Sequence, residues 1–352
     1  MNEVTTYGPS VTAWAGRVAL LCVVTLAAGC GCRDEPPRRV PIPSVAQSPL
    51  SGMAPLGSAP LCEPSAALTA PWDAEAILVA DNEVHDTLFV FRRGPEGRLL
   101  DQRQLPMPGQ GPRDVEALAA LGRDLLVVGS NSRNKRCETK KKRARIRQLR
   151  WEADTGRLAV VHQIEAQESW NASLLDETTC GRTLFTQPPP PGAREVCTTL
   201  VAASRTKEAC HTQNIEGAAA TPDGRIWLGL RSPLVGGRAV AMRLVWPSDA
   251  LRFDAVSFLD LGGDGVRELT VSGANVFILA GPPLDSTAEF GLWRAPVDSF
   301  ADNPSPAIVR TVPTSSEGLL VRDEDFLTLI DGAEGDNADQ CDLPGQQFRV
   351  AR

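Results

Sequence analysis

The stretch HTQNIEGAAATPDGRIWLGLRSP, from His211 to Pro233, contains the pattern that decides the fold. A carboxylate, Glu216, precedes a short apolar run, a polar turn (TPDGR) and a second apolar run (IWLGL). Two apolar runs joined by a turn that contains Pro, Asp and Gly are typical of a β-hairpin. A charged side chain at the head of such a hairpin is unexpected, unless the same position recurs elsewhere in the chain.

The same order of features does recur. Three further stretches have an acid, a short apolar strand, a polar turn and a second apolar strand, and they are headed by Glu116, Glu268 and Glu317. Two weaker copies fill the gaps: one has Asn171 in place of the acid, and the other covers residues 76–91. With position 171 included, the steps between units are 55, 45, 52 and 49 residues. A repeat of about 40–50 residues with several strands is typical of a β-propeller blade.

Four clear units and two weaker ones, including the first at residues 76–91, predict six blades. We therefore expect an all-β chain with a single, six-bladed β-propeller, and five or seven blades are the alternatives. Helical signals are nearly absent. The run VEALAAL, residues 115–121, is interpreted as a strand because Thr, Val and Gly occupy the same place in its sibling stretches.

The N-terminal segment resembles a bacterial lipoprotein signal peptide. An apolar run of eleven residues, Val18 to Ala28, follows Arg17 and is too short to span a bilayer. It leads into LAAGC, which resembles a lipobox and predicts a signal peptide over residues 1–29 and lipidation at Cys30. Gly31 follows, and by resemblance to envelope lipoproteins this favours the outer membrane. An ordinary secretion signal is the alternative.

Residues 30–71 are rich in Pro, Ser, Ala and Gly, so they bury too little apolar area to order themselves. We expect a disordered tether there and the propeller domain over residues 72–352. Export implies an oxidising compartment, in which the cysteines other than Cys22 of the signal, the lipidated Cys30 and Cys32 pair as disulfides. Six such cysteines predict three disulfides out of fifteen possible pairings: Cys62, Cys137, Cys180, Cys197, Cys210 and Cys341. Cys180 and Cys197 flank a proline-rich loop, and we expect them to close it.

The charge distribution limits the partners. A net charge of −7 and a pI near 5.2 argue against nucleic-acid binding. Residues 133–150 nevertheless carry ten Lys or Arg, and their alternation in RARIRQLRW predicts a strand with one cationic face after a lysine-rich loop. This stretch is either a surface for lipid head groups or polysaccharide, or a solvated loop.

The repeated acids define the candidate site. Equivalent positions on the innermost strands of a propeller face its central channel, so the four Glu side chains should converge. Converging carboxylates raise one another's pKa unless cations lie between them. The candidate ligand-binding residues are therefore Glu116, Glu216, Glu268, Glu317, Arg113, Arg133, Arg231 and Arg267. A network of salt bridges that only holds the blades together is the alternative.

Several of these strings resemble a known family. NIEGAAATPDGRIWLGLRSPLVGGRAVAMRL, LDLGGDGVRELT, ILAGP and GSNSRNKR resemble an uncharacterised bacterial propeller family, a domain of unknown function, over roughly residues 75–335. The element EG-(x)n-TPDGR also resembles phytase-like, or esterase-like, propellers. That second resemblance implies calcium bound by acids at one end of the channel. Here Arg side chains stand among the acids and no dense Asp cluster is present, which argues against phytase activity.

We predict a membrane-anchored envelope protein that binds an anionic or sugar-like ligand, such as a sugar phosphate, or a protein partner at the channel mouth. No nucleophile elbow, nucleotide-binding motif or zinc spacing is present in the sequence, which argues against a nucleophile-elbow hydrolase and a structural zinc site. The sequence favours a non-catalytic role and leaves catalysis open. One alternative is a calcium-assisted phosphate-ester hydrolase, and calcium is the one candidate cofactor. A structural scaffold with no small-molecule site is the other.

Overall fold

The structure is a computed structural model that describes residues 53–134, 136–206, 213–284, 288–322, 325–334 and 341–351. The predicted signal peptide, the predicted lipidation site Cys30, the first part of the predicted tether and Cys210 lie outside the described residues. No helix in the described part of the chain is long and apolar enough to cross a membrane.

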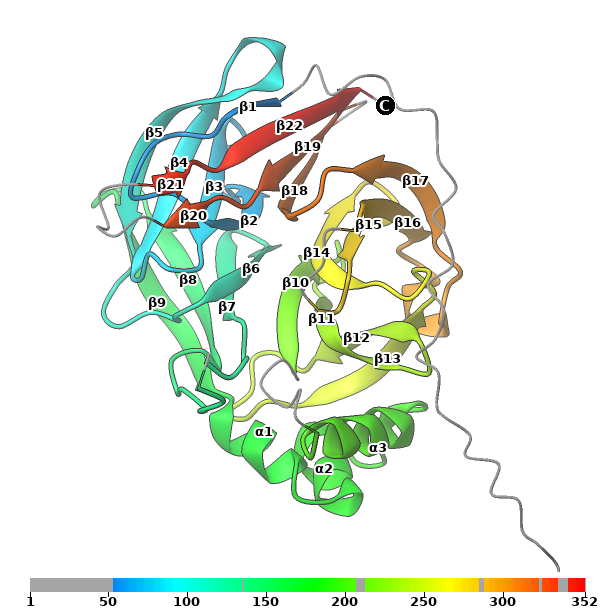
Figure 1. Cartoon of the computed structure of the whole chain (residues 1–352). Helices are drawn as coiled ribbons and strands as arrows, with labels where there is room; N and C mark the ends of the chain where they lie inside the picture. Colours follow the sequence, from blue (N-terminus) through cyan, green and yellow to red (C-terminus); the bar gives the residue numbers. More distant parts are fainter. Residues whose placement is uncertain are drawn as a thin grey trace, which may run out of the picture. The chain divides into compact units, whose positions relative to one another are not determined.

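Five four-stranded antiparallel sheets surround a central channel and form a five-bladed propeller (Figure 1). Blade 1 consists of β2 (Pro64–Thr69), β3 (Ala76–Asp81), β4 (Thr87–Arg93) and β5 (Leu99–Pro106). Blade 2 consists of β6 (Val115–Leu121), β7 (Asp124–Gly129), β8 (Arg145–Glu152) and β9 (Arg157–Glu165). Blade 3 consists of β10 (Asn214–Ala220), β11 (Ile226–Val235), β12 (Arg238–Leu244) and β13 (Phe253–Leu259).

Blade 4 consists of β14 (Gly265–Ser272), β15 (Asn275–Gly281), β16 (Phe290–Pro296) and β17 (Ala307–Val312). Blade 5 is ordered β18 (Ser316–Arg322), β19 (Asp325–Ile330), β22 (Gln346–Ala351) and β1 (Met53–Pro55). The first and last strands of the described chain therefore close the same blade. A small hairpin, β20 (Ala333–Glu334) and β21 (Cys341–Leu343), and two 3-10 turns, Pro95–Gly97 and Phe300–Asp302, complete the elements.

The prediction of six blades is wrong, because the unit assigned to Asn171 is a helical insertion between blades 2 and 3. It contains α1 (Gln167–Ser173), α2 (Glu177–Leu184) and α3 (Ala193–Ala203). The Asp176 side chain accepts a hydrogen bond from the Thr179 backbone N–H and caps α2. The buried residues of α3 follow helical spacing: Ala193, Val196, Cys197, Leu200 and Val201. The apolar face of this insertion joins the core between blades 2 and 3.

The hydrophobic core lies between neighbouring blades. Five clusters of buried side chains occupy the five interfaces between blades, and one of them also takes in the helices. Successive side chains of a strand point to opposite faces of the sheet, so each strand contributes to the clusters on both sides of its blade. Leu118 of β6 joins the cluster shared with blade 1, whereas Ala117 and Ala119 join the cluster shared with blade 3.

The N-terminal boundary of the domain also differs from the expected one. Strands β1 and β2 lie within residues 30–71, so the propeller begins before residue 72. A disulfide between Cys62 and Cys341 joins the segment before β2 to β21, across 279 residues of sequence. The expected disulfide between Cys180 and Cys197 is confirmed, and it joins α2 to α3. Cys137 is disulfide-bonded as well.

Candidate functional site

Each innermost strand carries a β-bulge near its first residue, and the bulge defines the ring at the channel. In every blade one residue is skipped in the pairing with the second strand. The skipped residues are Ser65, Glu116, Glu216, Arg267 and Glu317. A bulge re-aims a side chain out of the ladder, and bulges gather next to binding sites. The fourth member of the ring is therefore Arg267, and Glu268 occupies the next position along β14.

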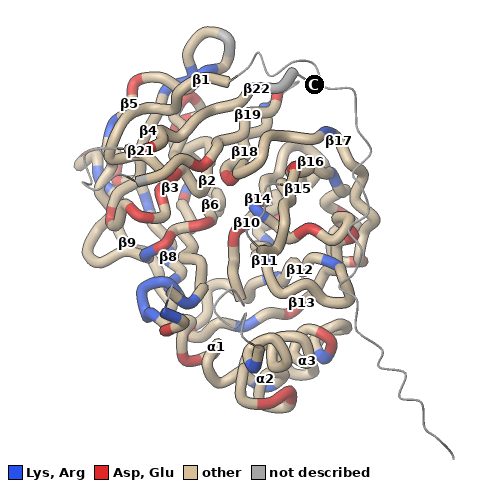
Figure 2. Tube along the Cα trace, viewed as in Figure 1, with Lys and Arg blue, Asp and Glu red and all other residues tan. Residues whose placement is uncertain are grey.

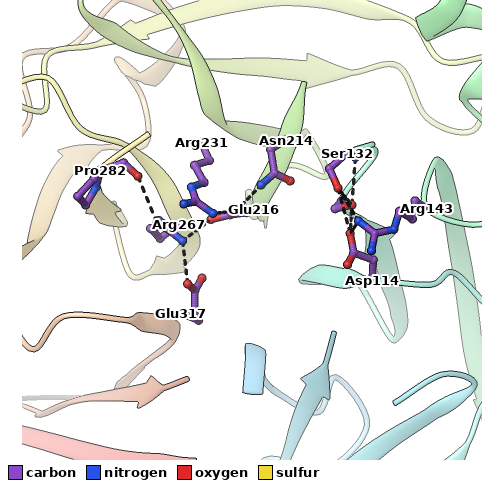
Figure 3. A network of polar contacts seen from close by, with 10 residues as sticks. Asp114, Ser132, Arg143, Asn214, Glu216, Arg231, Arg267, Pro282 and Glu317 are labelled. Carbon is purple, nitrogen blue, oxygen red and sulfur yellow. Dashed lines mark hydrogen bonds and ion pairs between the residues drawn. The ribbon is translucent and has the colours of Figure 1, made fainter. Parts of the chain in front are cut away.

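Arg267 ties three blades together (Figure 3). Its Nη1 atom lies 3.1 Å from Glu216 Oε2 and 2.8 Å from Glu317 Oε1. Its Nη2 atom donates to the backbone carbonyl of Pro282 at 3.2 Å, and its guanidinium lies 5.0 Å from the centre of the Phe290 ring. A cation thus separates two of the predicted carboxylates, as the sequence led us to expect.

Glu216 receives two further donors. Arg231 Nη1 lies 3.1 Å from Glu216 Oε1, and Asn214 Nδ2 donates to the same oxygen at 2.5 Å. The Glu216 side chain is almost fully buried, so these donors replace the water that its carboxylate would otherwise need. This half of the ring is consequently ion-paired and held in place.

Glu116 stands on the other side of the ring with a different environment. Its residue is 8% exposed, and within the described residues its carboxyl group takes part in no hydrogen bond or ion pair. Burial raises its pKa well above the usual 4.5, and the charges of Asp114, Glu216, Glu317 and Asp331 raise it further. The Glu116 carboxyl therefore keeps its proton over a wider pH range than an ordinary glutamate.

Asp331 adds a second acid of this kind. It follows β19 directly, and burial raises its pKa to about 8, with the charges of Glu317, Glu63 and Asp81 adding to the effect. Its Oδ1 atom is buried and has no hydrogen-bond partner among the described residues. The sequence prediction missed Asp331 because it lies at the end of a second strand and not at the head of an innermost one.

Glu268 lies one position beyond the ring, on β14. Its Oε1 atom accepts a hydrogen bond from the Leu269 backbone N–H at 2.9 Å. Burial raises its pKa well above 4.5, while hydrogen bonds from the backbone of Leu269, Ala67 and Ala218 act in the opposite direction. The Glu268 Oε2 atom is buried and has no hydrogen-bond partner among the described residues.

A second polar cluster lies before β6 (Figure 3). Asp114 Oδ2 lies 2.8 Å from Arg143 Nη1 and accepts hydrogen bonds from the hydroxyls of Ser130 and Ser132. Burial raises the pKa of Asp114, and the positive charge of Arg143 and the two serine hydroxyls counteract this. The backbone carbonyl of Ser130 accepts from the Ile215 N–H at 2.8 Å, which fixes this cluster against blade 3.

The other two predicted arginines lie outside the ring. Arg113 is exposed and lines a pocket of about 330 Å³ together with Asp114 and Arg143. Arg133 lines a different pocket, with Cys137 and Asn171. The structure thus joins Glu216, Glu317, Arg231 and Arg267 by ion pairs and places Glu116 in the same ring. Within the described residues, no group of three or more His, Cys, Asp or Glu side chains is arranged to hold a metal ion.

Residues 209–312 match a family described as a protein of unknown function (DUF3616). The match covers blades 3 and 4, which contain Glu216, Arg231 and Arg267. A comparison with curated proteins found no match.

Three solved structures are similar to this chain at low sequence identity. A GH43 β-1,3-galactosidase, BT3683, solved with galactodeoxynojirimycin, is 10% identical, with 83% of this chain and 90% of that chain covered and a TM-score of 0.46. A periplasmic gluconolactonase from Pseudomonas aeruginosa, PpgL, is 12% identical, with 83% and 68% covered and a TM-score of 0.33. U3-55K is 12% identical with a TM-score of 0.37; the match covers 80% of this chain and 62% of U3-55K.

Proposed function

We propose that this protein is a lipid-anchored binding protein of the bacterial envelope whose channel mouth holds a small polyhydroxylated ligand. The observation that carries the proposal is Glu116. Its carboxyl group lies at the ring and, within the described residues, takes part in no hydrogen bond or ion pair, whereas Glu216, Arg267 and Glu317 of the same ring are ion-paired. A carboxyl group that is largely withdrawn from water and has no protein partner is available to hydrogen-bond to a ligand hydroxyl.

The donors and acceptors of the ring match hydroxyl groups. A protonated Glu116 donates one hydrogen bond and accepts others, and the ionised carboxylates accept. Arg231 adds a donor that is held in place by its ion pair with Glu216. A hydroxyl both donates and accepts, so a sugar or polyol satisfies such a mixed set better than a simple anion does.

The same geometry disfavours the calcium-assisted hydrolase. Calcium takes six to eight oxygen ligands, most of them carboxylates and carbonyls. The space between Glu216 and Glu317 is occupied by Arg267 Nη1, at 3.1 and 2.8 Å from their oxygens. A divalent cation at that place would have to displace a buried guanidinium.

Saturation-transfer difference NMR tests the ligand proposal. The probes are glucose, N-acetylglucosamine and glycerol, applied to the wild type, to Glu116→Ala and to Glu152→Ala, a control at the end of β8. We expect saturation transfer to at least one probe with the wild type and the control, and its loss in Glu116→Ala. Absence of transfer to all three probes, or equal transfer in Glu116→Ala, contradicts the proposal.

The anchor is tested separately. The apolar run before LAAGC motivates the assignment of lipid to Cys30. Cys30→Ser should move the protein from the membrane fraction to the soluble fraction. A variant that still fractionates with membranes would refute lipidation at Cys30 without affecting the proposal for the channel.

A further inference from the structure

The basic stretch, residues 133–150, has two parts with different roles. In β8, Arg145 and Arg147 face inward: Arg145 donates to the carbonyls of Gln110 and Gly111, and Arg147 donates to those of Pro108 and Gln110. The cationic face expected from RARIRQLRW therefore exists, but it binds the loop between blades 1 and 2 instead of an external surface. A backbone hydrogen bond also connects that loop to the loop after β7: the Arg113 N–H donates to the Lys142 carbonyl at 3.0 Å.

The other cations of this region lie in the loop between β7 and β8, together with Arg113 of the loop before β6 (Figure 2). They line the pocket of about 330 Å³ named above, whose walls are Glu83, His85, Arg113, Asp114, Asn134, Lys140, Lys141, Lys142 and Arg143. Five cationic side chains face two acidic ones, so the lining carries a charge of +3 with a neutral histidine. The whole chain, in contrast, carries −7.

Three of the five cations are not compensated. Arg143 is paired with Asp114, and Lys140 is paired with Glu138 at 2.7 Å. Within the described residues, Arg113, Lys141 and Lys142 form no ion pair. Like charges this close repel one another, and an anion between them removes the repulsion.

The shape of the pocket selects a small ligand. Glu83 and His85 come from blade 1, and the remaining lining comes from the loops of blade 2, so the cations are enclosed on two sides and do not form a stripe. A volume of about 330 Å³ is at the lower end of small-molecule sites. Burial, with a contribution from the charge of Arg113, lowers the pKa of His85, so this ring serves as a neutral hydrogen-bonding group.

We propose that this pocket binds a small soluble oxyanion, a phosphate or sulfate group either free or as an ester, between Arg113, Lys141 and Lys142. Arginine offers two parallel N–H donors to such a group, and each lysine adds a positive charge. The site does not depend on the channel ring, because its cations are not members of the ring.

Isothermal titration calorimetry on the full chain with inorganic phosphate and with sulfate tests the proposal. We expect saturable binding that weakens at least tenfold in the double variant Lys141→Gln/Lys142→Gln and in Arg113→Gln. The matched control is Arg136→Gln, an exposed cation of the same loop that does not line the pocket, and it should bind as the wild type does. Glu116→Ala should also bind as the wild type, which separates this site from the channel.

Three results would overturn the proposal. The first is no saturable binding of either anion. The second is an unchanged affinity in the Lys141→Gln/Lys142→Gln variant, or an equal loss in Arg136→Gln, since either shows that the pocket is not the site. The third is binding only to vesicles that contain phosphatidylglycerol, which would mean that the loop reads an extended anionic surface.

Discussion

Arg267 Nη1 lies 3.1 Å from Glu216 Oε2 and thereby joins blade 4 to blade 3 at the channel mouth. The same atom lies 2.8 Å from Glu317 Oε1 of blade 5. This buried guanidinium is thus shared by the buried Glu216 carboxylate and the partly buried Glu317 carboxylate. Glu116, in contrast, takes part in no hydrogen bond or ion pair within the described residues.

Replacement of Arg267 tests this arrangement. Arg267→Met leaves Glu216 and Glu317 without their shared cation, and breaking a buried ion pair in this way costs about 3–5 kcal/mol. We expect a loss of this size in the free energy of unfolding, measured with urea. The control is Arg294→Met on the same blade, an exposed arginine, which should change the free energy by less than about 0.5 kcal/mol. A loss below about 1 kcal/mol in Arg267→Met would contradict the arrangement.

Asp331 predicts a pH dependence. Its folded-state pKa of about 8 lies above the usual 3.8, so between these values the folded state binds a proton that the unfolded state lacks. The contribution of this group to stability is present at low pH and is lost as the pH rises toward about 8. Asn does not titrate, so Asp331→Asn should gain stability relative to the wild type by about 1 kcal/mol or more between about pH 5 and about pH 8.5.

Urea unfolding of both proteins at the two pH values measures this difference. The exposed Asp249→Asn is the matched control. A difference between Asp331→Asn and the wild type that stays constant across the pH range would show that Asp331 titrates normally.

The two disulfides should contribute unequally to the free energy of unfolding. Cys62–Cys341 closes a loop of 279 residues and Cys180–Cys197 one of 17. In the chain-entropy view, the longer loop stabilises the folded state by about 2 kcal/mol more, because it restricts the unfolded chain more strongly. Unfolding of the two double-serine variants should therefore show the larger loss for Cys62→Ser/Cys341→Ser. Equal losses would mean that closure of the ring does not depend on this bond.

The hairpins were predictable because each second strand is a continuous apolar run between polar turns. This pattern is clear in residues 125–128 and 276–280, which are fully buried in β7 and β15. The number of blades was not predicted correctly. The repeat was extended to residues 170–187, where the buried side chains of α1 and α2 follow the spacing of a helix.

The pairing of the first and last strands, which closes the propeller, has no local signature in the amino-acid sequence. Strand β1 has three residues, and its pairing with β22 joins Met53 to Phe348. Hydrophobic periodicity cannot indicate such a short strand, and the pairing depends on contacts between the two ends of the chain. For the same reason the sequence could not show that residues 64–69 belong to blade 1 and not to the tether.

The ring was found only in part because its members share a backbone position and not a charge. Glu116, Glu216 and Glu317 are acids and were found, whereas Ser65 and Arg267 occupy the same bulge with other chemistry. In blade 4 the sequence analysis assigned the ring position to Glu268, because it is an acid, and was therefore one residue too far along the chain. The regular spacing was the available signal, since Ser65 and Glu116 are 51 residues apart, as are Glu216 and Arg267.

The titration of Glu116 decides most directly whether the channel mouth holds a neutral, unpaired carboxyl. Side-chain carboxyl carbons labelled with ¹³C report each glutamate by NMR, and the resonance missing in Glu116→Gln identifies this residue. We predict a midpoint well above 4.5 for Glu116, while Glu138, whose pKa Lys140 lowers, titrates below 4.5 in the same spectra. A Glu116 midpoint at or below 4.5 would show a charged carboxylate and would contradict the proposed site.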